Sequence, residues 1–246
     1  MNFMNYFKIF SVFSVFALVS CDLSENSLTD PPKVSAQPAF NSSYSVLWAT
    51  KTVSTIDVGN LGNLGGVIGD TEIEIGLAFA GFVDGGKFVP AGNVTVDNTT
   101  LKMQSNNTYI NEPTVQTPQG IEFSGNVKWV VDGNDKISAI NHSVSKSFPT
   151  ASGFEAAQTV DRSTSYTLSL STVTSADSIV YMVNDVVKTV GGSVKSVTFT
   201  PEELSKLKKG AAFAQVAPYN YEFKKFGKND FVFGNQIVLS KLITIK

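Results

Sequence analysis

Several residue types that carry chemistry are nearly absent from this sequence of 246 residues. It holds one cysteine, Cys21, one histidine, His142, and one arginine, Arg162. A single cysteine excludes an internal disulfide and a zinc site built from several thiolates. A single histidine excludes chemistry that needs a histidine pair. Arginine is the preferred fork for phosphate and carboxylate groups, so its scarcity, together with a net charge of −2, argues against a nucleic-acid groove.

Long apolar runs are also missing, except near the start of the chain. Residues 9–18 read IFSVFSVFAL and follow a short lead whose only cation is Lys8. Ten residues make a helix of ~15 Å, whereas a bilayer span needs roughly 20 residues. The run is therefore typical of a signal-peptide core and not of a permanent membrane span.

The apolar run ends in Leu18-Val19-Ser20-Cys21, which resembles the lipobox of bacterial lipoproteins. In that motif the cysteine sulfur is joined to a diacylglycerol group through a thioether bond. The small neighbouring residues give the signal peptidase access to the backbone. The resemblance implies that residues 1–20 are removed and that Cys21 is the lipidation site, carrying palmitate-type acyl chains. It also implies an outer-membrane, lipid-anchored location, with the membrane itself as a partner through Cys21.

The segment after the cysteine has the composition of a spacer. Residues 22–37 read DLSENSLTDPPKVSAQ and are rich in serine, proline and charge. Such a stretch cannot bury enough apolar surface to offset the entropy of ordering it. We expect residues 21–40 to form a flexible tether between the lipid and the folded part.

Beyond the tether, polar and apolar residues alternate as they do in β-strands. In residues 72–79 (EIEIGLAF) the apolar side chains Ile73, Ile75, Leu77 and Phe79 share one side, which we expect to be buried. Glycine-containing turn signals at 84–86 and 132–135 separate further expected strands. These lie at 94–96, 121–131 and 137–144.

A boundary is expected near residues 147–150, after which a second set of strands begins. One short helix is predicted in this half, because Thr200-Pro201-Glu202-Glu203 has the pattern of a capping box with proline at the first helical position. The expected strands are 166–170, 179–182, 197–199, 211–217, 221–226, 231–233 and 237–245.

The end of the chain has a leucine-containing crossover, Gly210 and a strand that ends in Ala217-Pro218-Tyr219-Asn220. This arrangement, within the last 80 residues or so, resembles the connection between strands E and F of fibronectin-type and other immunoglobulin-like sandwiches. The resemblance implies an all-β fold of two β-sandwich domains in tandem. We place the first at 41–150 and the second, immunoglobulin-like, at 151–246.

Few residues suit catalysis or metal binding, and we expect no catalytic site, metal or cofactor. His142 alternates with Ile140 and Val144 and is expected to be a partnered, half-buried strand residue. Glu72 and Glu74 share a strand face at a separation that would suit glycoside hydrolysis, but they are more typical of a solvated face. The glycine-rich residues 59–66 lack a phosphate-loop pattern, and residues 132–135, which read DGND, lack the spacing of a calcium loop.

Aromatic residues gather near the C-terminus. Tyr219, Tyr221 and Phe223 alternate in one strand, and Phe226, Phe231 and Phe233 lie close by in sequence. They could form a platform for a sugar or a protein, although alternating aromatics usually point into a core, which is the interpretation we favour. Trp48 and Trp129 are expected to be core anchors.

Three classes of function remain. A non-enzymatic binding or adhesion lipoprotein, with a glycan or a protein as ligand and no nucleic acid, fits best. The layout also resembles the lipoprotein precursors of fimbrial subunits, although the only arginine at which processing could occur is Arg162. A carboxylate-dependent envelope hydrolase is the third class.

Overall fold

The computed structural model describes residues 44–56, 71–111, 113–123 and 125–246, and these residues form an all-β protein. The only helix in these ranges is α1 (Pro201–Leu204), which is four residues long. The predicted all-β class is therefore confirmed, whereas two separate tandem domains are not. The signal peptide, Cys21, the tether and the glycine-rich loop lie outside the described residues.

One large sheet runs through the whole of the described chain. Its strands, in spatial order, are β16 (Val186–Gly191), β15 (Ser178–Val183), β18 (Gly210–Phe226), β19 (Asn229–Ile245), β1 (Ser45–Ile56), β2 (Thr71–Gly81), β8 (Thr108–Ile110) and β7 (Lys102–Met103). A short ninth strand, β12 (Thr159–Val160), also pairs with β19. We call this the main sheet.

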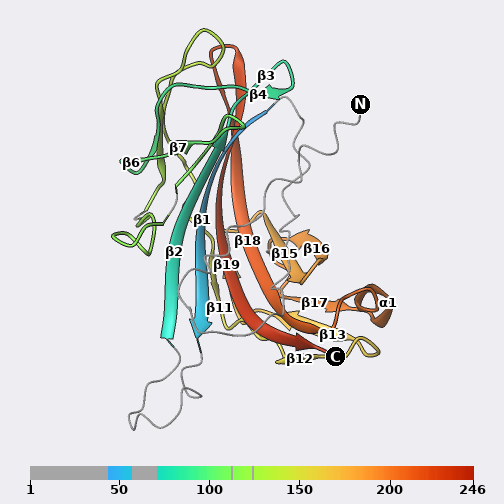
Figure 1. Cartoon of the computed structure of the whole chain (residues 1–246). Helices are drawn as coiled ribbons and strands as arrows, with labels where there is room; N and C mark the ends of the chain where they lie inside the picture. The colour runs from blue at the N-terminus through green and yellow to red at the C-terminus, as the bar shows by residue number, and fades with distance from the viewer. Residues whose placement is uncertain (1–43, 57–70, 112, 124) are drawn as a thin grey trace.

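Four long strands give the main sheet its curved shape. β2, β1, β19 and β18 run side by side along the length of the molecule (Figure 1). β18 and β19 are neighbours in an antiparallel hairpin, and β1 lies parallel to β19 with Ser45 opposite Phe231. The first and last described strands are therefore central in the sheet.

Smaller sheets cover one face of the main sheet. A four-stranded sheet covers the first half and consists of β10 (Ile140–Ser143), β9 (Lys128–Val131), β5 (Val94–Val96) and β6 (Thr99–Thr100). Two-stranded sheets add β11 (Thr150–Ser152) with β14 (Thr172–Thr174), and β13 (Tyr166–Ser169) with β17 (Ser196–Phe199). A small hairpin of β3 (Val83–Asp84) and β4 (Lys87–Phe88) follows β2, and Phe88 lies near Gly81 on the other side of the main sheet.

Two cores lie on this same covered face. Side chains alternate along a strand, so odd-numbered residues of β19 share one face. Phe231 and Phe233 belong to the first core, whereas Ile243 and Ile245 belong to the second. We call this the core face, and the opposite side of the main sheet the far face.

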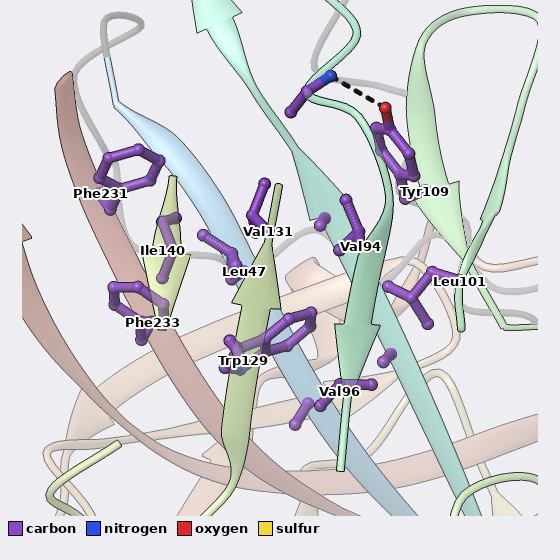
Figure 2. Close-up of a cluster of buried hydrophobic side chains, with 14 of the residues drawn as sticks. Leu47, Val94, Val96, Leu101, Tyr109, Trp129, Val131, Ile140, Phe231 and Phe233 are labelled. Carbon is purple, nitrogen blue, oxygen red and sulfur yellow. Dashed lines mark hydrogen bonds between the residues drawn. The ribbon is translucent and has the colours of Figure 1, made fainter. Parts of the chain in front are cut away.

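The first core is built around Trp129, which is fully buried. Trp129 and Val131 of β9 lie between Ile140 of β10 and Val94 of β5, in front of the long strands (Figure 2). Tyr109 closes this core, and its hydroxyl accepts a hydrogen bond from the backbone N–H of Ala91 at 2.9 Å. Trp129 is thus a core anchor, as predicted.

The second core lies under β13, β17 and α1. Thr200 and Glu203 form the predicted capping box, since each side chain bonds the other residue's backbone N–H. Leu204, at the end of α1, and Leu207, just after it, are both buried in the second core. The predicted short helix and its apolar side are confirmed.

The prediction of which side of β2 is buried was wrong. Ala78 and Ala80 face the first core, whereas Ile73 is 37% exposed and lies on the far face. Small residues are needed on the core face because large side chains of the opposing layer fill the space. A Cβ at Gly76 would meet the carbonyl oxygen of Ile121 at 1.8 Å.

The predicted breaks in the last two strands were also wrong, because β18 and β19 are continuous over 17 residues each. Pro218 was read as part of a strand end, yet it lies in the middle of β18. Its ring removes a backbone donor, and the β18–β19 ladder is not formed at Ala217 and Pro218. Pairing with β19 resumes at Tyr219, so the strand tolerates the interruption.

Candidate functional site

His142, the single histidine, is a partnered residue. It lies on β10 with its side chain 18% exposed, and its Nε2 atom is 2.5 Å from Oε1 of Glu222 on β18. Its ring also packs against the rings of Phe233 and Phe226, with centroids 4.8 and 5.6 Å away. These contacts confirm the expectation of a half-buried strand histidine.

Glu222 receives donors on both of its oxygens. Oε2 accepts the hydroxyl of Ser145 and, at 3.3 Å, the backbone N–H of Ser145. Burial alone would raise the pKa of Glu222, but the hydrogen bonds from Ser145 and His142 outweigh burial and hold the pKa below its ordinary value. The carboxylate at neutral pH is therefore ionised and acts as an acceptor.

This cluster has the residue types of a serine hydrolase in the wrong order. In a catalytic triad the serine hydroxyl donates to the imidazole, and the carboxylate holds the far side of the ring. Here Ser145 and His142 both bond Glu222, and among the described residues no hydrogen bond joins the serine hydroxyl to the imidazole. The arrangement fixes the segment after β10 onto β18.

Of the two acids considered for glycoside hydrolysis, Glu72 and Glu74, only the side chain of Glu74 can be described. Glu74 is 54% exposed at its side chain and forms an ion pair with Lys51 at 3.0 Å. The side chain of Glu72 lies outside the described residues. Exposure and a lysine partner are what a solvated strand face predicts for Glu74.

No metal site or membrane-spanning helix is found in the part of the chain that the structure describes. Groups of three or more histidine, cysteine, aspartate or glutamate side chains that could hold a metal ion are absent from it. Within the same ranges, no helix is long and apolar enough to cross a bilayer.

The aromatic residues near the C-terminus divide between the two faces of the main sheet. Phe231 and Phe233 are buried in the first core, against which Phe226 packs. Tyr219, Tyr221 and Phe223 point to the far face instead. The favoured interpretation as core is thus correct for the phenylalanines on β19, but Phe223 is 51% exposed.

A continuous row of rings extends along the far face; we call it the far-face aromatic row. Tyr44, Phe223, Tyr221, Tyr219 and Trp48 form it, with successive ring centroids 5.2, 5.4, 6.3 and 5.7 Å apart. Most neighbouring rings are tilted, and the Tyr221–Phe223 pair is edge to face. The rings stabilise one another in this geometry and do not form one flat plane.

Trp48 closes the buried end of the row. It lies directly over Gly234, where a Cβ would come within 2.2 Å of its ring. Its Nε1 atom donates to Oε1 of Gln236 at 3.2 Å. Trp48 is 3% exposed, so it is an anchor as predicted, but on the face opposite to the first core.

Buried polar groups lie beside the row on the far face. Gln215 is 5% exposed and donates from Nε2 to Oγ of Ser240 at 2.7 Å. Its Oε1 atom and Oγ1 of Thr52 have no hydrogen-bond partner among the described residues. At the middle of the row, Nζ of Lys146 lies 5.9 Å from the centre of the Tyr221 ring.

Large apolar side chains are exposed at the borders of the far face. Ile73, Phe223 and Leu242 are 37%, 51% and 65% exposed and come from three different strands. That all three lie on one face could not be read from the sequence, since it depends on the register that places β2, β18 and β19 in one sheet. Alternation along β18 identified only the part of the far-face aromatic row from Tyr219 to Phe223.

Arg162 has a structural role at the edge of the second half. Its NH1 group donates to the backbone carbonyl of Leu207 at 2.8 Å, and its Nε donates to that of Lys246 at 3.1 Å. A shallow hollow beside it is lined by Ser163, Glu202 and other polar residues. Arg162 therefore ties the end of the α1 turn to the end of β19.

No protein-family model and no curated protein matches this chain. The class of protein that the fold defines is an all-β protein with a shared central sheet, and function has to be argued from its surfaces.

Proposed function

We propose that this chain is a lipid-anchored protein of the outer membrane that binds a partner and catalyses nothing. Its anchor would be Cys21, joined through the tether of residues 21–40 to two immunoglobulin-like sandwich halves. The halves meet in one sheet, and each has its own core. The lipobox-like residues 18–21 support the anchor.

The observation that carries the binding proposal is the exposed end of the far-face aromatic row. Phe223 is half exposed, and Tyr44 and Tyr221 pack around it. Aromatic rings contribute large contact area at low entropic cost and are enriched at the centres of interfaces. Grouped exposed apolar side chains mark interaction surfaces more often than isolated ones do.

Ring geometry favours a protein ligand over a glycan. A sugar chain stacks best on rings that present parallel, open faces, whereas Tyr221 meets Phe223 at 80°. Edge-to-face rings leave recesses between them that suit apolar side chains. We therefore propose an apolar protein segment as the ligand, with a glycan as the alternative.

The test compares Phe223→Ala with Val115→Ala in the lipidated protein. Val115 is 93% exposed and lies on a loop away from the row, so it controls for the loss of any exposed apolar side chain. Cross-linking in cells should capture one envelope protein, and capture should fall at least tenfold for Phe223→Ala only. Equal capture by both variants would refute the proposed surface.

A glycan array run with the same two variants decides the ligand class. Glycan binding that Phe223→Ala removes would replace the protein ligand with a sugar. Turnover of glycan or ester substrates that disappears in Glu74→Ala or His142→Ala would overturn the non-enzymatic function and support the envelope hydrolase.

A subunit of a fimbria-like assembly is the second candidate, and the open edge of β2 favours it. β8 pairs with β2 only at Phe79–Gly81, so residues 71–75 have no partner strand on that side among the described strands. Such an edge can accept a strand from another subunit. Even-numbered residues of β2 direct their backbone groups to this edge, as Gly76 and Ala78 do. Co-purification with pili, lost when Glu74 is replaced by proline, would support this function.

A further inference from the structure

We call the parts of the molecule around the first and the second core its two halves. A polar contact spans the boundary between them. Residues 142–147 leave β10 and cross the core face of β18 and β19, and we call this segment the strap. At the strap the two cores are interrupted, since Asn220 and Asn235 occupy the core face between them. These two asparagines are opposite each other in the β18–β19 register.

Both asparagines hold the strap by its backbone. Nδ2 of Asn235 donates to the carbonyl of Lys146 at 2.7 Å, and Nδ2 of Asn220 donates to that of Ser147 at 2.7 Å. Nδ2 of Asn220 also donates to the carbonyl of Ser175 at 2.9 Å, and Ser175 belongs to the turn before β15. One amide group thus binds segments from both halves.

Charged contacts fasten the strap on either side of the asparagines. Glu222 holds His142 and Ser145 at the end nearer the first core. At the other end, Lys146 pairs with Asp177 at 2.6 Å, and Asp177 also accepts the backbone N–H of Tyr221. Asp177 precedes β15, so this pair again links the first half with the second.

The asparagines are costly at these positions. Asn220 and Asn235 are 1% and 0% exposed, and the Oδ1 atom of each has no hydrogen-bond partner among the described residues. A buried, unpaired amide oxygen is destabilising, and an apolar side chain would avoid that cost. Their benefit lies in the three bonds that their Nδ2 atoms donate.

We propose that the strap, held by Asn220 and Asn235, couples the two halves so that they unfold as one unit. Besides the strap, two features join the halves. One is the long strands, whose β18–β19 pairing is interrupted at Ala217 and Pro218. The other is the far-face cluster that contains Trp48, Val180 and Val238. Without the strap, each core could lose its packing while the other remained folded.

The positions of the tryptophans make the coupling measurable. Trp129 lies in the first core, so its fluorescence reports the first half, whereas far-ultraviolet circular dichroism reports the strands of both. Trp48 belongs to a far-face cluster that includes Val180 of the second half, so it is replaced by phenylalanine in every chain compared, the otherwise wild-type one included. In urea, the full, otherwise wild-type chain should give coincident transitions with the two probes. The Asn220→Ala/Asn235→Ala variant should give two transitions with separate midpoints.

Asn229→Ala is the matched control. Asn229 also makes several hydrogen bonds through its amide, to Ser138 and Lys136, but all of them lie within the first half. In the Asn229→Ala variant, the fluorescence and circular dichroism transitions should shift to lower urea concentration together. Coincident transitions in the double variant, or separate transitions in the wild type, would overturn the proposal.

Native-state hydrogen exchange of the wild type tests the same idea if the double variant does not fold. The slowest amides of β9 in the first half and of β15 in the second should open with the same free energy and the same urea dependence. Different values would show that the halves open independently and would refute the coupling.

Discussion

Replacement of Glu222 by alanine should be one of the most damaging single changes in the polar part of the molecule. The side chain is 10% exposed and accepts three donors, from Nε2 of His142 and from the hydroxyl and backbone N–H of Ser145. Each such bond contributes about 1 kcal/mol net, and the donors left behind lose their acceptor. We expect Glu222→Ala to lower the free energy of unfolding by about 3 kcal/mol.

Urea unfolding at neutral pH measures this loss, and Glu155→Ala is the control. Glu155 is exposed, and its side chain accepts a single long bond from Ser169 at 3.3 Å, so its removal should change the free energy by less than about 0.5 kcal/mol. A loss below about 1 kcal/mol for Glu222→Ala would show that the carboxylate does not hold the strap.

The same carboxylate predicts a pH dependence. Because the pKa of Glu222 is lower in the folded state, its contribution is fully present above the ordinary value of 4.5 and is lost as the pH falls through the folded-state pKa. Glu222→Gln should remove this part of the acid-side loss. If the stability profiles of the wild type and Glu222→Gln stay parallel on the acid side, the reasoning fails.

Three further predictions concern other parts of the chain. Cys21→Ser should abolish incorporation of a fatty-acid analogue in cells, because a hydroxyl does not form the thioether; label retained on the variant would disprove lipidation there. Gly234→Ala should cost about 1–3 kcal/mol in urea unfolding, since the new methyl group would displace the Trp48 ring; an unchanged midpoint would contradict the observed packing. Arg162→Ala should lower the melting temperature by several degrees through loss of its bond to the Leu207 carbonyl, and an unchanged melting curve would count against that role.

Local patterns in the sequence were enough to predict the class of fold and several elements. Alternation within residues 121–131 predicted a strand, and β9 occupies residues 128–131 of that range. Val127, Trp129 and Val131 are all buried in the first core. The pattern Thr200 to Glu203 predicted a capped helical turn, which is present. These features depend on residues close in sequence, so a single sequence contains the information.

The direction of a strand face could not be predicted in the same way. Ile73 and its alternating neighbours were assigned to the core because they are larger than Gly76, Ala78 and Ala80. The main sheet, however, has apolar clusters on both of its faces, and the closer packing is on the side with the small residues. The size of the side chains alone therefore does not show which face of a strand packs against the main core.

The far-face aromatic row shows the same limit for the candidate site. Alternation grouped Tyr219, Tyr221 and Phe223, but nothing in the sequence connected them with Trp48, more than 170 positions earlier. Their contact depends on β1 lying parallel to β19, with Trp48 opposite Gly234. The absence of a side chain at Gly234 is what admits the tryptophan ring.

Buried amides explain why the strap escaped prediction altogether. A polar residue in an alternating strand is normally assigned to the solvated side, and Asn220, between Tyr219 and Tyr221, follows that pattern. Asn235 instead shares its side with Phe233 and Ile237, so it is a polar residue on an apolar side. Both are buried because their amide groups bind the backbone of a segment far away along the chain, 89 positions in the case of Asn235 and Lys146. Backbone carbonyls are the same in every residue, so no side-chain pattern in the strap marks it as their partner. Such contacts therefore become visible only when the register of the sheet is known, and they are the contacts on which the coupling of the two halves depends.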